Sequence, residues 1–135
     1  MISAGNATVY VREMDRAVEF YVNTLGLKLT NRFGNQWATV DAGRGLMIGL
    51  HAESDTAPAP GTRGAMTLGF EIDEPMATIV KRLAARGVSF EGDAISNEVG
   101  EFAFGSDQDG NPFYFWEPSA LYREATATAT AASRA

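Results

Sequence analysis

The sequence has 135 residues, of which 45% are hydrophobic, and this suits a single compact domain of a soluble protein. Its formal net charge of -6 argues against a nucleic-acid or anionic-membrane partner, because both require a basic surface. The absence of cysteine excludes disulfides, thiolate metal sites and cysteine nucleophiles. No apolar run approaches the ~18 residues of a membrane span, and the first residues lack a basic, then apolar, leader pattern. We therefore expect a cytoplasmic protein.

The first half of the chain predicts a strand, a helix and three further strands. Alternating Val9 and Val11 are typical of a strand, and a stripe of apolar residues from Met14 to Leu25 follows at helical spacing. Gly26 suits the end of that helix. The predicted strands cover residues 6–12, 27–33, 36–41 and 46–51, and the helix covers 14–25.

The second half repeats this order. Segment 53–64, with Pro58 and Pro60, predicts a linker. Strands are predicted over 66–72, 88–91, 101–105 and 112–117, a helix over 75–85 capped by Asp73, and a polar loop over 92–100. The Ala/Thr-rich tail, residues 123–135, has no large side chain to bury, so we expect it to be disordered.

The two halves align with each other. A shift of 61 residues places Val11 on Ile72 and Gly26 on Gly87. This predicts two tandem βαβββ modules, about 5–52 and 65–118, within one domain spanning 1–122. The expected fold class is α+β, with a curved eight-stranded mixed sheet that encloses a central cup and has its helices outside.

Two segments resemble a known family. Residues 11–26 read VREMDRAVEFYVNTLG, and residues 104–112 read FGSDQDGNP. They are similar to the vicinal oxygen chelate superfamily, which includes glyoxalase I, extradiol dioxygenases, fosfomycin-resistance enzymes and bleomycin-binding proteins. The resemblance covers about residues 5–118 and implies the paired-module fold. Because members commonly dimerise, it also implies a homodimer. Such a fold hosts many functions, so it does not name a reaction.

The resemblance also locates the positions where enzymes of this family hold a divalent metal, usually through His or Glu. In this chain those positions are Asn6, Gly49, Thr67 and Tyr114. A first-row divalent metal requires deprotonated carboxylate or imidazole donors, and none of these four residues supplies one. The single histidine also excludes a site with two histidines. We therefore expect no metal and no cofactor.

Strand alternation predicts which residues face the cup. One face is uniformly apolar and should pack under the helices, whereas the other mixes aromatic, small and polar residues. The predicted ligand-binding residues are Asn6, Thr8, Tyr10, Trp37, Thr39, Met47, Gly49, His51, Thr67, Gly69, Tyr114 and Trp116. Gly49 and Gly69 are expected to leave room for the ligand. Such a lining is typical of a small-molecule site, and the alternative is that the rings fill the cup and leave no cavity.

The titratable residues offer one candidate for catalysis. His51 is predicted to act as an acid, a base or a ligand hydrogen-bond partner, oriented by Glu71 or Glu101; the alternative is a histidine half in water at the rim. Asp107 and Asp109 are predicted to form a turn, and Arg12 to be a solvated surface charge.

Two main hypotheses follow. The first is a metal-free protein that binds a hydrophobic or aromatic small molecule, an antibiotic or a metabolite, as bleomycin-resistance proteins do. The alternative is an enzyme of the same superfamily, of lyase, isomerase or dioxygenase type, either metal-independent or with non-standard metal ligands. A dimer-forming module without a ligand is a third possibility.

Overall fold

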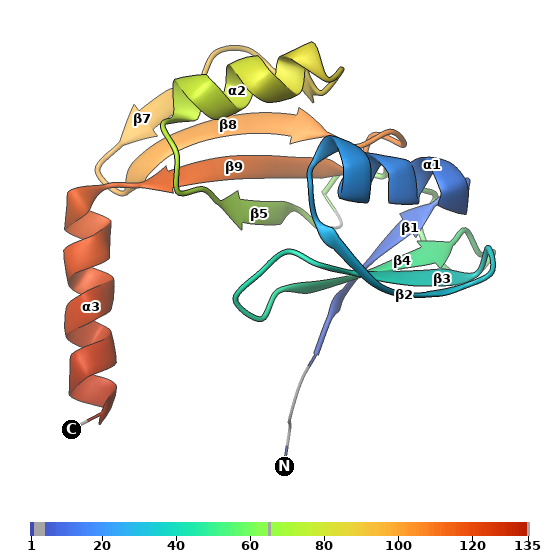
Figure 1. Ribbon diagram of the computed structural model, residues 1–135, viewed down its shortest axis with the longest axis horizontal. Helices are drawn as coiled ribbons and strands as arrows, with labels where there is room; N and C mark the ends of the chain where they lie inside the picture. The colour runs from blue at the N-terminus through green and yellow to red at the C-terminus, as the bar shows by residue number, and fades with distance from the viewer. Residues whose placement is uncertain (2–4, 65, 135) are drawn as a thin grey trace. The chain divides into compact units, whose positions relative to one another are not determined.

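The computed structural model describes residue 1, residues 5–64 and residues 66–134, with side chains up to position 128. Within these residues the chain has a mixed α+β fold with two mixed sheets and three α-helices (Figure 1). It divides into unit 1, Met1–Thr67 with Ser106–Pro112, and unit 2, Leu68–Gly105 with Phe113–Ala135. None of the described helices is long and apolar enough to cross a bilayer.

Unit 1 contains a four-stranded sheet. Its strands are β1 (Ala7–Val11), β2 (Lys28–Phe33), β3 (Trp37–Asp41) and β4 (Met47–Ala52), in the order β1-β4-β3-β2. β1 and β4 are parallel, and the other pairs are antiparallel. All four lie within one or two residues of the predicted strands. Val9, Val11, Ile48 and Leu50 are buried as the alternation predicted.

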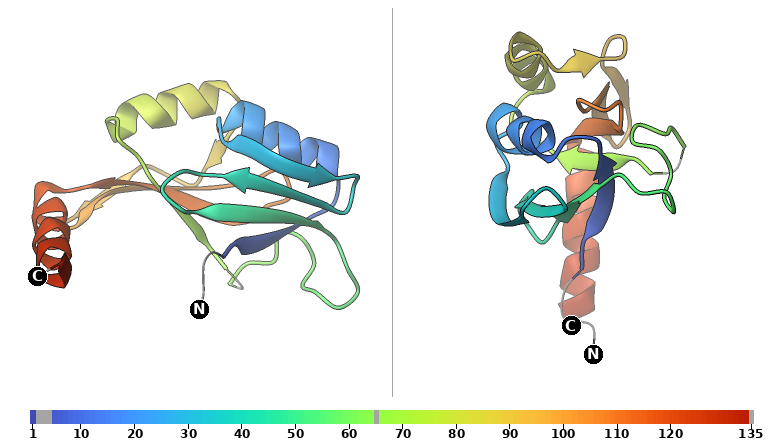
Figure 2. Two further views of the ribbon diagram at one scale, coloured as in Figure 1. Left: turned by 60° about the horizontal axis from the view of Figure 1, so that its bottom comes forward. Right: turned by 90° about the vertical axis from the view of Figure 1, so that its right-hand side faces the viewer.

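The helix of unit 1 covers that apolar face (Figure 2). It begins as α1 (Met14–Val18) and continues as a π-helical segment, η1 (Glu19–Thr24). The wider π-helical turn closes where the Leu25 N–H donates to the Phe20 carbonyl, five residues back, at 2.9 Å. The predicted helix is therefore present, but its second half is wound differently from the expected α-helix.

Segment 106–112 is held in unit 1 by the carboxylate of Asp107, which is only 6% exposed. Its Oδ2 accepts from the Tyr21 hydroxyl and the Asn111 amide, both at 2.8 Å. Its Oδ1 accepts from the backbone N–H groups of Asp109 and Asn111, both at 2.9 Å. Asp107 thus forms the predicted turn and also fastens that turn to the helix.

Arg12, which we predicted to be a solvated surface charge, forms hydrogen bonds to two other segments of unit 1. Its backbone N–H and its Nη1 donate to the Asp109 carboxylate at 3.0 and 3.1 Å, and its Nη2 donates to the Pro60 carbonyl at 3.1 Å. The Gly61 N–H donates to Asn111 Oδ1 at 2.9 Å. The end of the segment predicted as a linker is therefore bonded to the body of unit 1.

Unit 2 contains the second sheet. Its strands are β5 (Leu68–Glu71), β6 (Ser89–Phe90), β7 (Ile95–Asn97), β8 (Gly100–Ser106) and β9 (Pro112–Pro118). The order is β5-β9-β8-β6, and β7 pairs with β8 (Figure 1). β7 lies within residues 92–100, where we predicted a polar loop. It runs antiparallel to β8, with Ile95 paired with Phe102. Hydrogen bonding therefore gives two sheets; their joining into one curved eight-stranded surface stays a prediction.

The first helix of unit 2 is α2 (Met76–Ala85), with Met76, Ile79 and Leu83 buried, close to the predicted bounds. The predicted cap, Asp73, is not at its start, which Pro75 occupies with φ -57°. The Met76 N–H instead donates to Glu117 Oε1 on β9 at 2.9 Å. A carboxylate distant in sequence therefore satisfies the helix start.

The tail forms a helix, α3 (Ala120–Arg134), where we expected disorder from residue 123. The expectation of disorder considered only the lack of large side chains to bury. Alanine has the highest intrinsic helix propensity, and this favours a helix in an alanine-rich segment. Ser119 caps this helix, because its Oγ accepts the Tyr122 N–H at 3.1 Å. The Tyr122 ring also packs edge-on against Trp116, with a centroid distance of 4.4 Å.

Tyr21→Phe should lower stability and change its pH dependence. Burial, and then the Asp107 charge, raise the pKa of Tyr21 well above the ordinary tyrosine value of about 10. In alkali the unfolded chain therefore loses this proton while the folded chain keeps it, so the free energy of unfolding falls as pH rises above about 10. Without the hydroxyl, we expect that fall to be shallower by up to ~1.4 kcal/mol per pH unit.

Urea denaturation at neutral and alkaline pH measures this effect. At neutral pH the Tyr21→Phe variant should be less stable by about 1.5–3 kcal/mol, the range for a hydrogen bond to a charged group. Tyr10→Phe, which removes the same atom from a half-buried ring, serves as the control. Equal alkaline slopes for the wild type and Tyr21→Phe would contradict a buried, protonated Tyr21.

Candidate functional site

A row of four rings crosses the sheet of unit 1 on the face opposite α1. The strand register places Tyr10 beside His51, His51 beside Trp37, and Trp37 beside Phe33. The His51 ring lies 5.3 Å from Tyr10 and 6.0 Å from Trp37, measured between centroids. Three of these residues were predicted to share a face, and the structure of unit 1 brings them together.

Phe33 was missed in the sequence analysis. It is 67% exposed and lies at the end of the row, on the edge strand β2. The pairing of β2 with β3 shifts between Leu29 and Asn31, and this shift resets which β2 residues share a face with Trp37. Period-two alternation alone gives no sign of such an irregularity.

Trp37 occupies the room that Gly49 was expected to leave for a ligand. A Cβ atom placed on Gly49 would lie 2.1 Å from Trp37 Cη2, so the indole ring lies directly over the glycine. The indole Nε1 donates to Thr39 Oγ1 at 2.8 Å, which fixes the plane of the ring. In the strand register Thr8 and Thr39 lie on either side of Gly49. These three residues form a second row on the same face, parallel to the row of rings.

Unit 2 carries a second aromatic face. On β9, Tyr114 lies over Gly69, whose added Cβ would meet the Tyr114 Cζ at 2.4 Å. On β8, Phe102 stacks on Trp116 with a centroid distance of 6.1 Å, and Phe104 lies 5.9 Å from Tyr114. The two phenylalanines were also missed, although they flank the buried Ala103 in the alternation of a half-buried strand.

His51 is oriented by its own strand. Its Nδ1 lies 2.6 Å from the Ala52 carbonyl oxygen, which can only accept, so Nδ1 carries the proton. The predicted orienting residues, Glu71 and Glu101, lie on β5 and β8 of unit 2. His51 also borders a cavity of about 660 Å³, whose wall includes Glu53 and Asp55.

The remaining predicted residues lie at the margins of the strands. Asn6 and Thr67 are exposed and precede β1 and β5, and Met47 is half-buried at the start of β4. Asn6 Oδ1 accepts from the Thr8 hydroxyl at 3.3 Å. Asn6 and Thr67 thus offer polar groups, and Met47 a flexible apolar one, at the ends of the strands.

The residues at the family's metal positions do not fit a metal ion. Gly49 has no side chain, Asn6 and Thr67 offer neutral oxygens, and Tyr114 offers a phenol. Across residues 5–64 and 66–128, no group of three or more His, Asp or Glu side chains is placed to hold a metal.

Comparison with known proteins places this geometry in a family, although no curated protein matches the chain. The chain is similar to TnmS3, an antibiotic-binding protein from Streptomyces sp. CB03234, with 27% identity, a TM-score of 0.72, and coverage of 88% of this chain and 98% of that chain. A glyoxalase/bleomycin resistance protein from the same organism has 28% identity, a TM-score of 0.68, and coverage of 84% and 99%.

A lactoylglutathione lyase from Agrobacterium tumefaciens shares the fold, at 19% identity and a TM-score of 0.67, with coverage of 85% of this chain and 92% of that chain. A family model described as the Glyoxalase/Bleomycin resistance protein/Dioxygenase superfamily matches residues 4–115, which confirms the resemblance seen in the sequence. The chain therefore belongs to the glyoxalase/bleomycin resistance protein/dioxygenase superfamily.

Proposed function

We propose that this protein binds a hydrophobic or aromatic small molecule by stacking it on the ring-bearing face of the unit 1 sheet, without a metal ion. The observation that carries the proposal is the position of Trp37, whose ring lies directly over Gly49 and donates a hydrogen bond to Thr39. A ring held in place before binding loses little conformational freedom when a planar ligand stacks on it.

The surroundings of Trp37 support a ligand with a planar apolar part. Tyr10, His51 and Trp37 are half-buried, and Phe33 is largely exposed, so the row presents ring surface along its length. Thr8 and Asn6 add hydroxyl and amide groups near one end. A mostly aromatic surface with a few polar groups is the usual composition of a small-molecule site.

The similarity to an antibiotic-binding protein supports an antibiotic as the ligand. That protein is 27% identical over 88% of this chain. The residues at the four metal positions support binding without a metal, because none of them provides a carboxylate or imidazole. A resistance role by sequestration follows from this proposal.

The proposal extends to a homodimer, which the family resemblance implies. Sedimentation velocity at micromolar concentrations should give about twice the chain mass of 14.5 kDa. A single species at the monomer mass across that range would contradict this part of the proposal and leave the stacking surface to be tested separately.

Truncating the exposed ring of the row should weaken binding without unfolding the protein. Phe33→Ala removes a ring that is 67% exposed, so its effect on stability should be small. Loss of one stacking contact, about 0.5–1.5 kcal/mol, should weaken binding by about two- to tenfold. Tryptophan fluorescence titration with bleomycin and with a planar aromatic antibiotic measures this change.

The matched control is Leu29→Ala, on the same strand but on the other face, where Leu29 pairs with Val40. This variant should bind as the wild type does. The titrations are repeated with EDTA, which should leave the affinity unchanged. Equal weakening by both variants, or binding abolished by EDTA, would contradict metal-free stacking on this face.

Gly49→Ala should displace the Trp37 ring. The new methyl group would overlap the indole, break its hydrogen bond to Thr39, and lower stability by about 1–3 kcal/mol, the usual cost of overpacking. The near-ultraviolet circular dichroism of tryptophan and the affinity for the antibiotic should fall together. In a Trp37→Ala background the same substitution should cost little, because the overlapping ring is gone. A similar cost in both backgrounds would show that the glycine matters for another reason.

A further inference from the structure

We propose that the Asp109–Gly110 peptide is the site at which this chain forms isoaspartate spontaneously, and that Arg12 restrains this reaction in the folded protein. The modification is independent of the proposed ligand binding. An aspartate followed directly by a glycine occurs at this one place in the sequence. Because glycine has no side chain to hinder its own nitrogen, this pair is the one in which the nitrogen most easily attacks the preceding carboxyl group.

The reaction needs only water. The Gly110 nitrogen attacks Asp109 Cγ, and its proton leaves with one carboxylate oxygen and one proton from solvent as water, so a five-membered imide forms. Water then opens the ring. Cleavage of the bond between the nitrogen and Cγ restores aspartate, whereas cleavage of the bond between the nitrogen and the main-chain carbonyl carbon gives isoaspartate. No group is oxidised or reduced.

Three N–H donors hold the carboxylate that would have to react. Asp109 Oδ2 accepts from the Arg12 backbone N–H at 3.0 Å and from Gln108 Nε2 at 2.9 Å, and Oδ1 accepts from Arg12 Nη1 at 3.1 Å. The Asp109 side chain is 6% exposed. Both oxygens are therefore engaged, so neither can leave as water until some of these bonds break.

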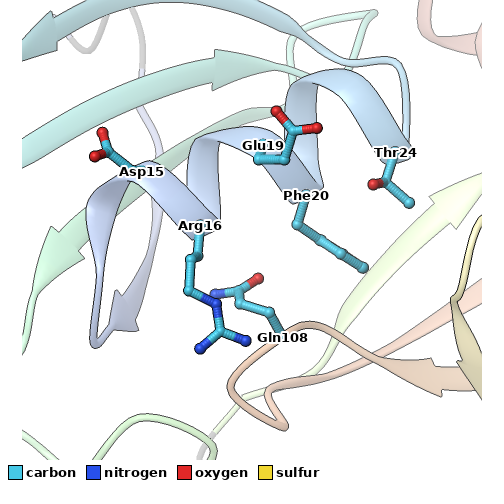
Figure 3. Close-up of a pocket in the computed structure, with 6 residues that line it drawn as sticks. All are labelled: Asp15, Arg16, Glu19, Phe20, Thr24 and Gln108. Atoms are coloured by element: carbon cyan, nitrogen blue, oxygen red, sulfur yellow. The ribbon is translucent and has the colours of Figure 1, made fainter.

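The two residues that supply these donors differ in strength. Figure 3 shows the Gln108 side chain extending from its loop towards the helix, where it borders a cavity of about 320 Å³ beside η1. Gln108 contributes one donor from a neutral amide, whereas Arg12 contributes two donors, one of them on its charged guanidinium. Hydrogen bonds between two charged groups are stronger, so Arg12 is the main restraint.

The attacking nitrogen is also engaged. The Gly110 N–H, which must lose its proton, donates to the Asp107 carbonyl at 3.0 Å. The main-chain carbonyl of Asp109 is crowded, because a Cβ atom placed on Gly61 would lie 2.0 Å from its oxygen. The imide ring is flat and includes this carbonyl group, so ring formation needs freedom that the contact with Gly61 limits.

Isoaspartate at position 109 would disturb the network around Asp107. The backbone N–H groups of Asp109 and Asn111 both donate to Asp107 Oδ1 at 2.9 Å. Isoaspartate inserts one methylene carbon into the main chain between these two donors, so they cannot both keep their present geometry. The fastening of segment 106–112 to the helix would weaken, and the restraint by Arg12 therefore preserves unit 1.

The test incubates the full-length protein at neutral pH, folded in buffer and unfolded in urea. Isoaspartate is measured with an isoaspartyl methyltransferase and S-adenosylmethionine and is located by peptide mapping. The signal should arise at position 109, slowly in the folded wild type and much faster in urea. Asp109→Glu should abolish it, because attack would then form a less favourable six-membered ring. Equal rates in buffer and urea, or a signal mainly at another position, would overturn the proposal.

Arg12→Ala should form isoaspartate in buffer about tenfold faster than the wild type, a factor equivalent to about 1.4 kcal/mol. The matched control is Arg82→Ala, which removes an arginine–carboxylate pair of unit 2, where Arg82 bonds to Glu74 at 2.7 and 2.9 Å. This control should age as the wild type does. A wild-type rate for Arg12→Ala, or equal acceleration by both variants, would overturn the role of Arg12.

A second variant covers the case in which Arg12→Ala does not fold. Gln108→Leu removes the amide donor to Asp109 Oδ2 and leaves both Arg12 donors in place. Its rate in buffer, divided by its own rate in urea, should exceed the same ratio for the wild type, because one of the three bonds is lost. An unchanged ratio would overturn the restraint by hydrogen bonding.

Discussion

The buried carboxylate of Asp107 is the constraint on which unit 1 depends. No described cation pairs with this carboxylate at salt-bridge distance, and it is satisfied instead by four hydrogen bonds from a phenol, an amide and two backbone N–H groups. A buried charge is tolerated only when its lone pairs are occupied, so these donors must stay in place together. One of them, the Asn111 amide, also donates to the Tyr10 carbonyl at 3.1 Å. The helix, the turn and the strand that carries Tyr10 are thus fixed by a single polar network.

That network positions two different surfaces. Tyr21 ties the helix to segment 106–112, and the same turn presents Gln108 to the cavity beside η1. On the sheet, the residues that alternate with the apolar face carry the rings, so the packing of Val9 and Leu50 under the helix sets the orientation of Tyr10 and His51.

The sequence predicts those parts of the fold that follow from fixed periodicities. The alternation of Val9 and Val11 indicates correctly which side chains of β1 face the core. Alternation does not reveal that Phe33 shares a face with Trp37. The pairing of β2 with β3 shifts between Leu29 and Asn31, so residues before and after the shift that are two apart no longer lie on the same face. An apolar stripe fits both an α-helix and its π-helical continuation, so the pattern of apolar residues cannot predict that η1 is π-helical. The bond from Tyr21 to Asp107 joins residues 86 positions apart, and no local pattern reports such a pair.

The glycine at position 49 is the residue that allows the Trp37 ring to lie where it does. The family resemblance makes this a position where enzymes hold a metal ligand. In this chain the indole of Trp37 passes so close to the Gly49 Cα that even a Cβ atom would overlap it. Any side chain there, histidine and glutamate included, would have to displace the ring and break its bond to Thr39. A side chain at position 49 and the Trp37 ring in its present place are thus mutually exclusive.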